Sequence, residues 1–162
     1  MTTYYLDASA LVKYYIPERG SEWIGSLLNE RGLDGHWAGA AVTSLLSNVE
    51  GVCALERAVR SGHIDFSTRD VARRRLLLDM RYRFRVLGVD SHLALRAAGL
   101  AERYSLRAYD AVHLAAALTL TESLAQERLS ACVLVSADED LLSAAHAEKL
   151  AIANPNDYPA GV

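Results

Sequence analysis

The sequence of 162 residues is poor in cysteine, proline and long apolar runs. Its two cysteines, Cys53 and Cys132, stand alone in apolar segments, which excludes a disulfide scaffold and a zinc site of the CxxC type. We expect both to be reduced core residues of a cytoplasmic protein. The least polar run, residues 111–120, is too short to cross a bilayer. No basic region precedes the first apolar residues, so we expect neither a secretory signal nor a membrane partner.

An excess of positive charge is also lacking, because the formal net charge is −3. This argues against a protein that binds polyanions over its whole surface. The sequence is 51% hydrophobic and 23% charged, which is the balance of a globular chain long enough to bury a core. We expect one domain over residues 1–162, with an irregular tail over residues 154–162.

Positive charge is concentrated in one segment, in which seven arginines accompany only Asp70 and Asp79. The seven are Arg69, Arg73, Arg74, Arg75, Arg81, Arg83 and Arg85. Such a segment is explained either by a solvated helix face or by a patch that contacts phosphates. Both interpretations stay open, and Arg73, Arg74 and Arg75 are the candidate phosphate contacts.

Short segments of strand character alternate with longer segments of helical periodicity. Strands are predicted at residues 3–6, 37–42, 84–89, 132–136 and 151–153. Helices are predicted at residues 8–16, 22–30, 44–60, 66–82, 92–104, 109–124 and 138–149. Strands separated by helices indicate βαβ units, and therefore an α/β fold whose mainly parallel sheet is covered by helices on both faces.

Four acidic residues stand where such a fold places its ligand sites, beyond the carboxyl ends of the strands. Asp7 directly follows the first predicted strand, and Asp138 follows the strand at residues 132–136. Asp110 lies in the first turn of a helix, and Glu50 lies in the helix after the second predicted strand. We expect all four to converge at one end of the sheet.

Each acid also has a purely structural explanation. Asp110 and Asp138 stand where carboxylates stabilise helix N-termini. Glu50 is also explained as an exposed helix residue or as a partner of Arg57. Asp7 is harder to explain in this way, because its neighbours are apolar and a buried carboxylate needs a partner. Oxygen ligands in this number favour Mg2+ or Mn2+, which support phosphodiester hydrolysis.

Neighbouring residues limit the other kinds of chemistry. His113 shares a helix face with Asp110, which makes it a candidate metal ligand. A histidine that packs in the interior or lies on the surface is, however, the commoner case. Asp140, two residues after Asp138, is a candidate supporting residue. Ser9 has no histidine near it in the sequence, so no covalent nucleophile is predicted. A haloacid-dehalogenase phosphatase would need an aspartate at position 9, where this sequence has a serine. A receiver domain would need a pair of acidic residues after the first strand, and this pair is missing.

Four segments resemble, in the same order, the motifs of PIN domains of the VapC toxin type. They are YYLDASALVKYYIPE at 4–18, SLLSNVEGVCALERA at 44–58, LRAYDAVHLAAAL at 106–118 and LVSADEDLLSAA at 134–145. One such segment would be weak support, whereas four in order span nearly the whole chain. The resemblance implies a PIN-type three-layer α/β/α sandwich. It also implies a metal-dependent endoribonuclease that is the toxin of a type II toxin–antitoxin pair.

The resemblance further implies roles and partners. It makes Asp7, Asp110 and Asp138 catalytic ligands of Mg2+ or Mn2+. It makes Glu50 a fourth catalytic ligand, which binds the metal directly or through water. Ser9 and Ser136 match positions that support such a site through hydrogen bonds. The expected partners are an RNA substrate, whose phosphates the arginine segment would contact, a cognate antitoxin protein and a second copy of the chain in a homodimer.

Gly51 departs from the family pattern. It follows Glu50 within a helix interior, where glycine costs about 0.5–1 kcal/mol relative to alanine, and it is expected to loosen that helix. Two alternatives to a toxin stay open. One is a PIN nuclease of RNA processing, and the other is a non-catalytic PIN binding module with a vestigial site.

Overall fold

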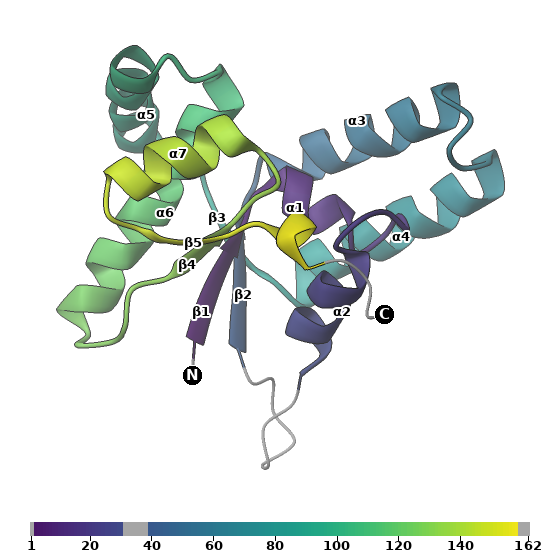
Figure 1. Ribbon diagram of the computed structural model, residues 1–162, viewed down its shortest axis with the longest axis horizontal. Coiled ribbons are helices and arrows are strands. Elements are labelled where there is room, and N and C mark those ends of the chain that lie inside the picture. The colour runs from purple at the N-terminus through teal and green to yellow at the C-terminus, as the bar shows by residue number, and fades with distance from the viewer. Residues whose placement is uncertain (1, 31–38, 159–162) are drawn as a thin grey trace.

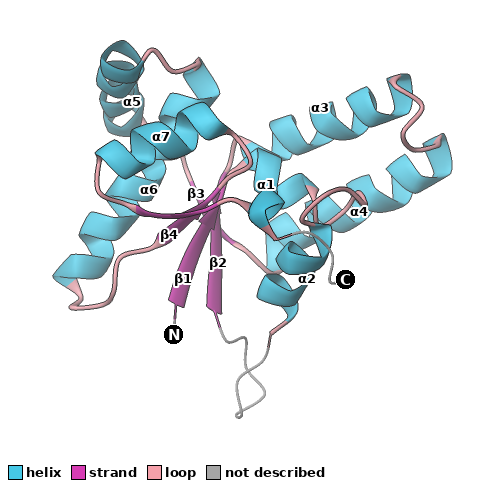
Figure 2. Cartoon of the chain, in the orientation of Figure 1, coloured by secondary structure: helices cyan, strands magenta, loops and turns pink. Residues whose placement is uncertain are grey.

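The computed structural model describes residues 2–30 and 39–158. Its centre is a sheet of five strands in which neighbouring strands run parallel (Figures 1 and 2). The strands are β1 (Thr2–Leu6), β2 (Gly39–Ser44), β3 (Arg85–Leu87), β4 (Val133–Val135) and β5 (Ala151–Ala153). Their order across the sheet is β3-β2-β1-β4-β5, so β1 is central. The predicted α/β fold with a parallel sheet is confirmed.

Helices cover both faces of this sheet (Figure 1). They are α1 (Ala8–Val12), α2 (Ser21–Asn29), α3 (Ser47–Arg60), α4 (Phe66–Tyr82), α5 (Ser91–Tyr104), α6 (Ala108–Gln126) and α7 (Glu139–Ala147). Successive strand residues point to opposite faces. Tyr5 and Leu134 accordingly pack with α5, α6 and α7, whereas Leu6 and Val135 pack with α1 to α4. The result is a three-layer α/β/α sandwich.

Helix α6 is buried on most of its circumference, as expected of a helix that is apolar all round. Its buried residues are Ala111, His113, Leu114, Ala115, Ala116, Ala117, Leu118, Leu120 and Leu124. This packing between the sheet and the outer helices holds the first turn of α6 in place. Because Asp110 lies in that turn, burial of the helix fixes the position of one of the four acids.

Most element boundaries differ from the sequence predictions by one or more residues, and three of these differences have a structural cause. Strand β2 covers Gly39–Ser44 instead of residues 37–42, of which the first two lie outside the described residues. Helix α3 consequently begins at Ser47, because Ser44 pairs with β3. Helix α1 ends at Val12, since the N–H groups of Tyr14 and Tyr15 bond carbonyls three residues back and form tighter turns.

The structure also differs from the expectations for one thiol and for the tail. Cys132 is buried, but Cys53 is exposed, because it lies on the side of α3 that faces a pocket. In the tail expected to be irregular, Pro155–Asp157 forms a 3-10 turn and Tyr158 stacks on Trp23 at 4.4 Å between ring centroids. Residues 159–162 of that tail lie outside the described residues. Among the helices of the described chain, none combines the length and the apolarity that a membrane span requires.

Candidate active site

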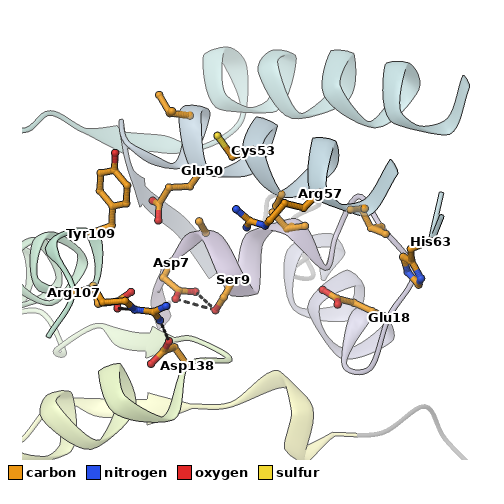
Figure 3. A pocket seen from close by; sticks show the side chains of 17 residues that line it. Asp7, Ser9, Glu18, Glu50, Cys53, Arg57, His63, Arg107, Tyr109 and Asp138 are labelled. Carbon is orange, nitrogen blue, oxygen red and sulfur yellow. Dashed lines mark hydrogen bonds and ion pairs between the residues drawn. The ribbon is translucent and has the colours of Figure 1, made fainter. Parts of the chain in front are cut away.

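A pocket of about 550 Å³ lies at the carboxyl ends of β1 and β4 (Figure 3). Its wall includes four acids from separate segments: Asp7, Glu50, Asp110 and Asp138. Asp7 and Asp138 cap α1 and α7, while Glu50 and Asp110 lie in the first turns of α3 and α6. Parallel strands end at the same edge of a sheet, and this brings the four acids together.

Asp7 is held in one orientation by hydrogen bonds. Its side chain is 3% exposed, and its Oδ1 accepts the capping bond from the backbone N–H of Ala10 at 2.9 Å. Its Oδ2 accepts from the hydroxyl of Ser136 at 2.7 Å, and the hydroxyl of Ser9 lies 2.8 and 2.9 Å from the two oxygens. Ser9 Oγ also accepts from the backbone N–H of Ala137 at 2.8 Å. The two serines thus join the ends of β1 and β4 beside Asp7.

Burial raises the pKa of Asp7, although the charge of His113 and the hydrogen bonds to the carboxylate lower it in part. A buried carboxylate is unfavourable when its charge is not compensated. Among the described residues, Asp7 forms no ion pair with a lysine or arginine. The ionised form of Asp7 would therefore be stabilised by a cation in the pocket.

Arg107, the N-cap residue of α6, links two of the other acids (Figure 3). Its Nε lies 2.9 Å from Oδ2 of Asp110, and its Nη2 lies 2.6 Å from Oδ2 of Asp138. Partial burial raises the pKa of Asp110; the hydrogen bond from Arg107 opposes this shift, and the charge of Asp138 adds to it. Arg107 is 78% exposed, so it compensates the two carboxylates from the solvent side of the pocket.

Glu50 is supported from the protein interior by His113. The Nε2 atom of His113 lies 2.7 Å from Oε2 of Glu50, and its Nδ1 atom lies 2.9 Å from the hydroxyl of Tyr5. The ring is 1% exposed, which agrees with a packing histidine. Burial lowers the pKa of His113, but the hydrogen bond to Glu50 and the nearby carboxylates outweigh this, so the pKa is raised. The protonated ring is thereby favoured next to Glu50.

Gly51 has a packing role that the sequence did not reveal. A Cβ atom at this position would lie 2.6 Å from Cδ2 of Leu76, which is fully buried in α4. Glycine therefore allows α3 and α4 to approach closely at this point. Helix α3 continues without a break on both sides of the glycine, and its close approach to Leu76 accounts for a glycine next to Glu50.

The donor set of the pocket suits a hard divalent cation, because carboxylate oxygens are the ligands that Mg2+ and Mn2+ prefer. In residues 2–30 and 39–158, no three Asp, Glu, His or Cys side chains converge closely enough to form a ligand set. Arg107 lies between Asp110 and Asp138 and takes up oxygen lone pairs of both. The residues fit a divalent cation provided that Arg107 releases these carboxylates.

Other residues singled out in the sequence lie outside the pocket. Asp140 is exposed on α7 and does not line it. The same is true of Arg73, Arg74 and Arg75 on α4, and Arg75 donates to the hydroxyl of Tyr14 at 2.7 Å. The structure therefore does not bring the arginine triplet to the four acids.

Sequence reasoning missed three residues of the site. Arg107 had a usable signal, because it stands three residues before Asp110 and side chains at this spacing meet on a helix. Arg57, which lines the pocket, was considered only as a partner of Glu50. Tyr5 had no signal, since it meets His113 across 108 residues of sequence.

Comparison with known proteins agrees with this architecture. PAE2754 from Pyrobaculum aerophilum is similar in structure, with 22% identity and a TM-score of 0.60 over 96% of this chain and 85% of that chain. A toxin–antitoxin complex from Klebsiella pneumoniae has 17% identity and a TM-score of 0.55, over 94% of this chain and 97% of that one. FitAcB from Neisseria gonorrhoeae has 17% identity and a TM-score of 0.53, over 93% and 96%.

At the level of sequence, curated proteins give no match. The profile of the PIN domain family, in contrast, matches residues 4–148. This stretch contains β2, β3, β4 and most of β1, and it contains the four acids of the pocket. The chain belongs to the PIN domain family.

Proposed function

We propose that this protein is a metal-dependent endoribonuclease and the toxin of a toxin–antitoxin pair. PIN domains are in general nucleases, which supports hydrolysis of a phosphodiester. The observation that carries the proposal is that Asp7, Glu50, Asp110 and Asp138 line one pocket at the carboxyl edge of the sheet. A purely structural role, such as helix capping, does not explain why four carboxylates line the same pocket while one of them, Asp7, is almost fully buried.

In this proposal Asp7, Asp110 and Asp138 hold Mg2+ or Mn2+, and Glu50 binds directly or through water. When bound, the ion supplies an activated water and stabilises the oxygen that leaves the phosphate. The serine hydroxyls fix Asp7, and His113 fixes Glu50, so that these carboxylates keep their orientation.

Ser9 is not a nucleophile in this proposal. Its hydroxyl donates to Asp7 and accepts from the backbone of Ala137, so its hydrogen-bonding capacity is committed to structure. No histidine is among its hydrogen-bond partners in the described chain. Hydrolysis by an activated water is therefore the reaction that the residues support.

The assignment as a toxin, with an antitoxin, an RNA substrate and a second copy of the chain as partners, rests on the family motifs and on likeness to a toxin–antitoxin complex. A cytoplasmic location belongs to the same proposal, and it agrees with two free thiols. A nuclease of RNA processing is the alternative within the family. Gly51 no longer supports the alternative of a vestigial site, because its packing against Leu76 explains why a glycine stands there.

The first experiment is incubation of the purified protein with mixed cellular RNA in Mg2+, in Mn2+ and in EDTA. The test variant is Asp7→Asn, which keeps the size of the side chain, and the matched control is Asp140→Asn, whose carboxylate is exposed outside the pocket. We expect cleavage that requires metal, is lost in Asp7→Asn and persists in Asp140→Asn. No cleavage by the wild-type protein in either metal would overturn the proposal.

A second experiment separates a toxin from a processing nuclease. We expect production of the wild-type chain in bacteria to stop growth, whereas production of Asp7→Asn at the same level should not. Growth that is equal for both, together with RNA cleavage in vitro, would favour the processing nuclease.

A further inference from the structure

The pocket extends beyond the four acids along α3. Its wall continues from Glu50 through Cys53 and Ala54 to Arg57, and it ends near His63. Residues at these spacings lie on one face of a helix. Arg57 stands seven positions after Glu50 on α3, which is a rise of about 10 Å along the helix axis at 1.5 Å per residue. The pocket wall therefore continues about two helical turns beyond Glu50 along α3.

Arg57 points into this pocket from α3 (Figure 3). Its guanidinium is exposed, and it has no hydrogen bond or ion pair with any described residue. Several other arginines of the chain are paired, as Arg96 is with Glu122 and Arg103 with Glu148.

The acids of the pocket do not supply a partner for Arg57, because they have other partners. Glu50 is bonded to His113, and Glu18 lies 3.4 Å from the ammonium group of Lys13. Asp110 and Asp138 share Arg107 at the other end. A guanidinium with five N–H donors therefore faces the pocket with its hydrogen-bonding capacity unused.

We propose that Arg57 binds a backbone phosphate of the RNA next to the bond that is cleaved, and so places the strand along α3. This inference rests on the proposed function and names the substrate contact of the same site. A guanidinium binds a phosphate with two parallel hydrogen bonds, whereas bound sugars or bases would leave its charge uncompensated. Arg57 acts as a positioning residue, since it lies about two helical turns from Glu50.

The test measures binding of a labelled single-stranded RNA as a function of salt, at constant Mg2+, in an Asp7→Asn background that prevents cleavage. We expect Arg57→Ala to weaken binding about tenfold at low salt. The slope of log K against log salt should fall in magnitude by about 0.7, the value for one phosphate contact to a single strand. Arg57→Lys should keep most of that slope.

Arg60→Ala is the matched control, because Arg60 is exposed on the same helix but does not line the pocket. It should leave both affinity and slope unchanged. In the active protein, Arg57→Ala should raise KM and leave kcat nearly unchanged. Circular dichroism checks that the variants are folded, which is expected for exposed positions.

The two proposals fail in different ways. If the wild-type protein cleaves RNA and Arg57→Ala keeps its slope and KM, the role of Arg57 is overturned and the nuclease stands. An effect of Arg60→Ala as large as that of Arg57→Ala would also overturn the role of Arg57. Both arginines would then contribute to RNA affinity only through the overall positive charge of the helix. If the wild-type protein neither cleaves nor binds RNA, both proposals are overturned.

Discussion

The Nε2 atom of His113 lies 2.7 Å from the carboxylate of Glu50, and this contact joins the interior of the protein to its pocket. Glu50 is 19% exposed and His113 only 1%. On its other side the ring reaches the hydroxyl of Tyr5, which is fully buried in the central strand. A buried imidazole with partners on both nitrogens fixes the rotamer of an acid at the surface.

His113→Ala should destabilise the protein by about 3 kcal/mol, because it leaves a cavity and removes a hydrogen-bond partner from Tyr5 and Glu50. Urea denaturation measures this loss. Tyr5→Phe removes one hydrogen bond only and should cost about 1 kcal/mol. Equal stability of His113→Ala and the wild-type protein would show that the buried pair contributes nothing.

Asp7→Asn should stabilise the metal-free protein at neutral pH by about 0.5–2 kcal/mol, the usual size of a stabilising substitution, because it removes a buried charge. Burial raises the pKa of Asp7 in the folded protein. Its contribution to stability is then greatest below the ordinary pKa of about 3.9 and is lost as the pH rises through the folded pKa.

Thermal unfolding in EDTA across this pH range tests the prediction. The difference between Asp7→Asn and the wild-type protein should grow as the pH rises. Saturating Mg2+ should then stabilise the wild-type protein more than the variant. A variant that is less stable than the wild type at pH 7 in EDTA would contradict the argument from burial.

Arg107→Ala should bind Mn2+ more tightly than the wild-type protein does. The guanidinium competes with the ion for Asp110 and Asp138, and exposed ion pairs contribute up to about 1 kcal/mol, or about fivefold in affinity. Calorimetry or electron paramagnetic resonance of Mn2+ measures the dissociation constant. Arg103→Ala, which removes an ion pair with Glu148, is the control and should leave it unchanged. Weaker binding by Arg107→Ala would mean that Arg107 supports the metal.

Gly51→Ala should destabilise the protein by about 1 kcal/mol, even though alanine is the better helix former. The added methyl group would lie 2.6 Å from Cδ2 of Leu76, so this fully buried side chain would have to shift. Gly25→Ala in α2 is the matched control, because no atom lies within 4 Å of a Cβ there, and it should be stabilising by about 0.5–1 kcal/mol. Chemical denaturation of both variants checks the contrast, and two changes of the same sign would contradict it.

Much of the fold follows from local patterns in the sequence. Consecutive apolar residues such as Tyr5 and Leu6 point to opposite faces of a strand and so indicate that both faces are buried. Helices between successive strands indicate a parallel sheet. Parallel strands end at one edge, so Asp7 and Asp138 could be placed together from their positions after two strands. The same rule was the basis for predicting that Asp110 and Glu50 lie at this edge, and both line the pocket.

The tertiary structure alone decided the contacts between distant segments. The bond of His113 to Glu50 joins α6 to α3, and the space that Gly51 leaves for Leu76 depends on how two helices pack. The bridge from Arg107 to Asp138 and the exposure of Cys53 depend on packing in the same way. Strand and helix periodicity is set by neighbours along the chain and can be read from the sequence. Which side chains meet across layers is set by the packing of whole elements, and no local pattern records it.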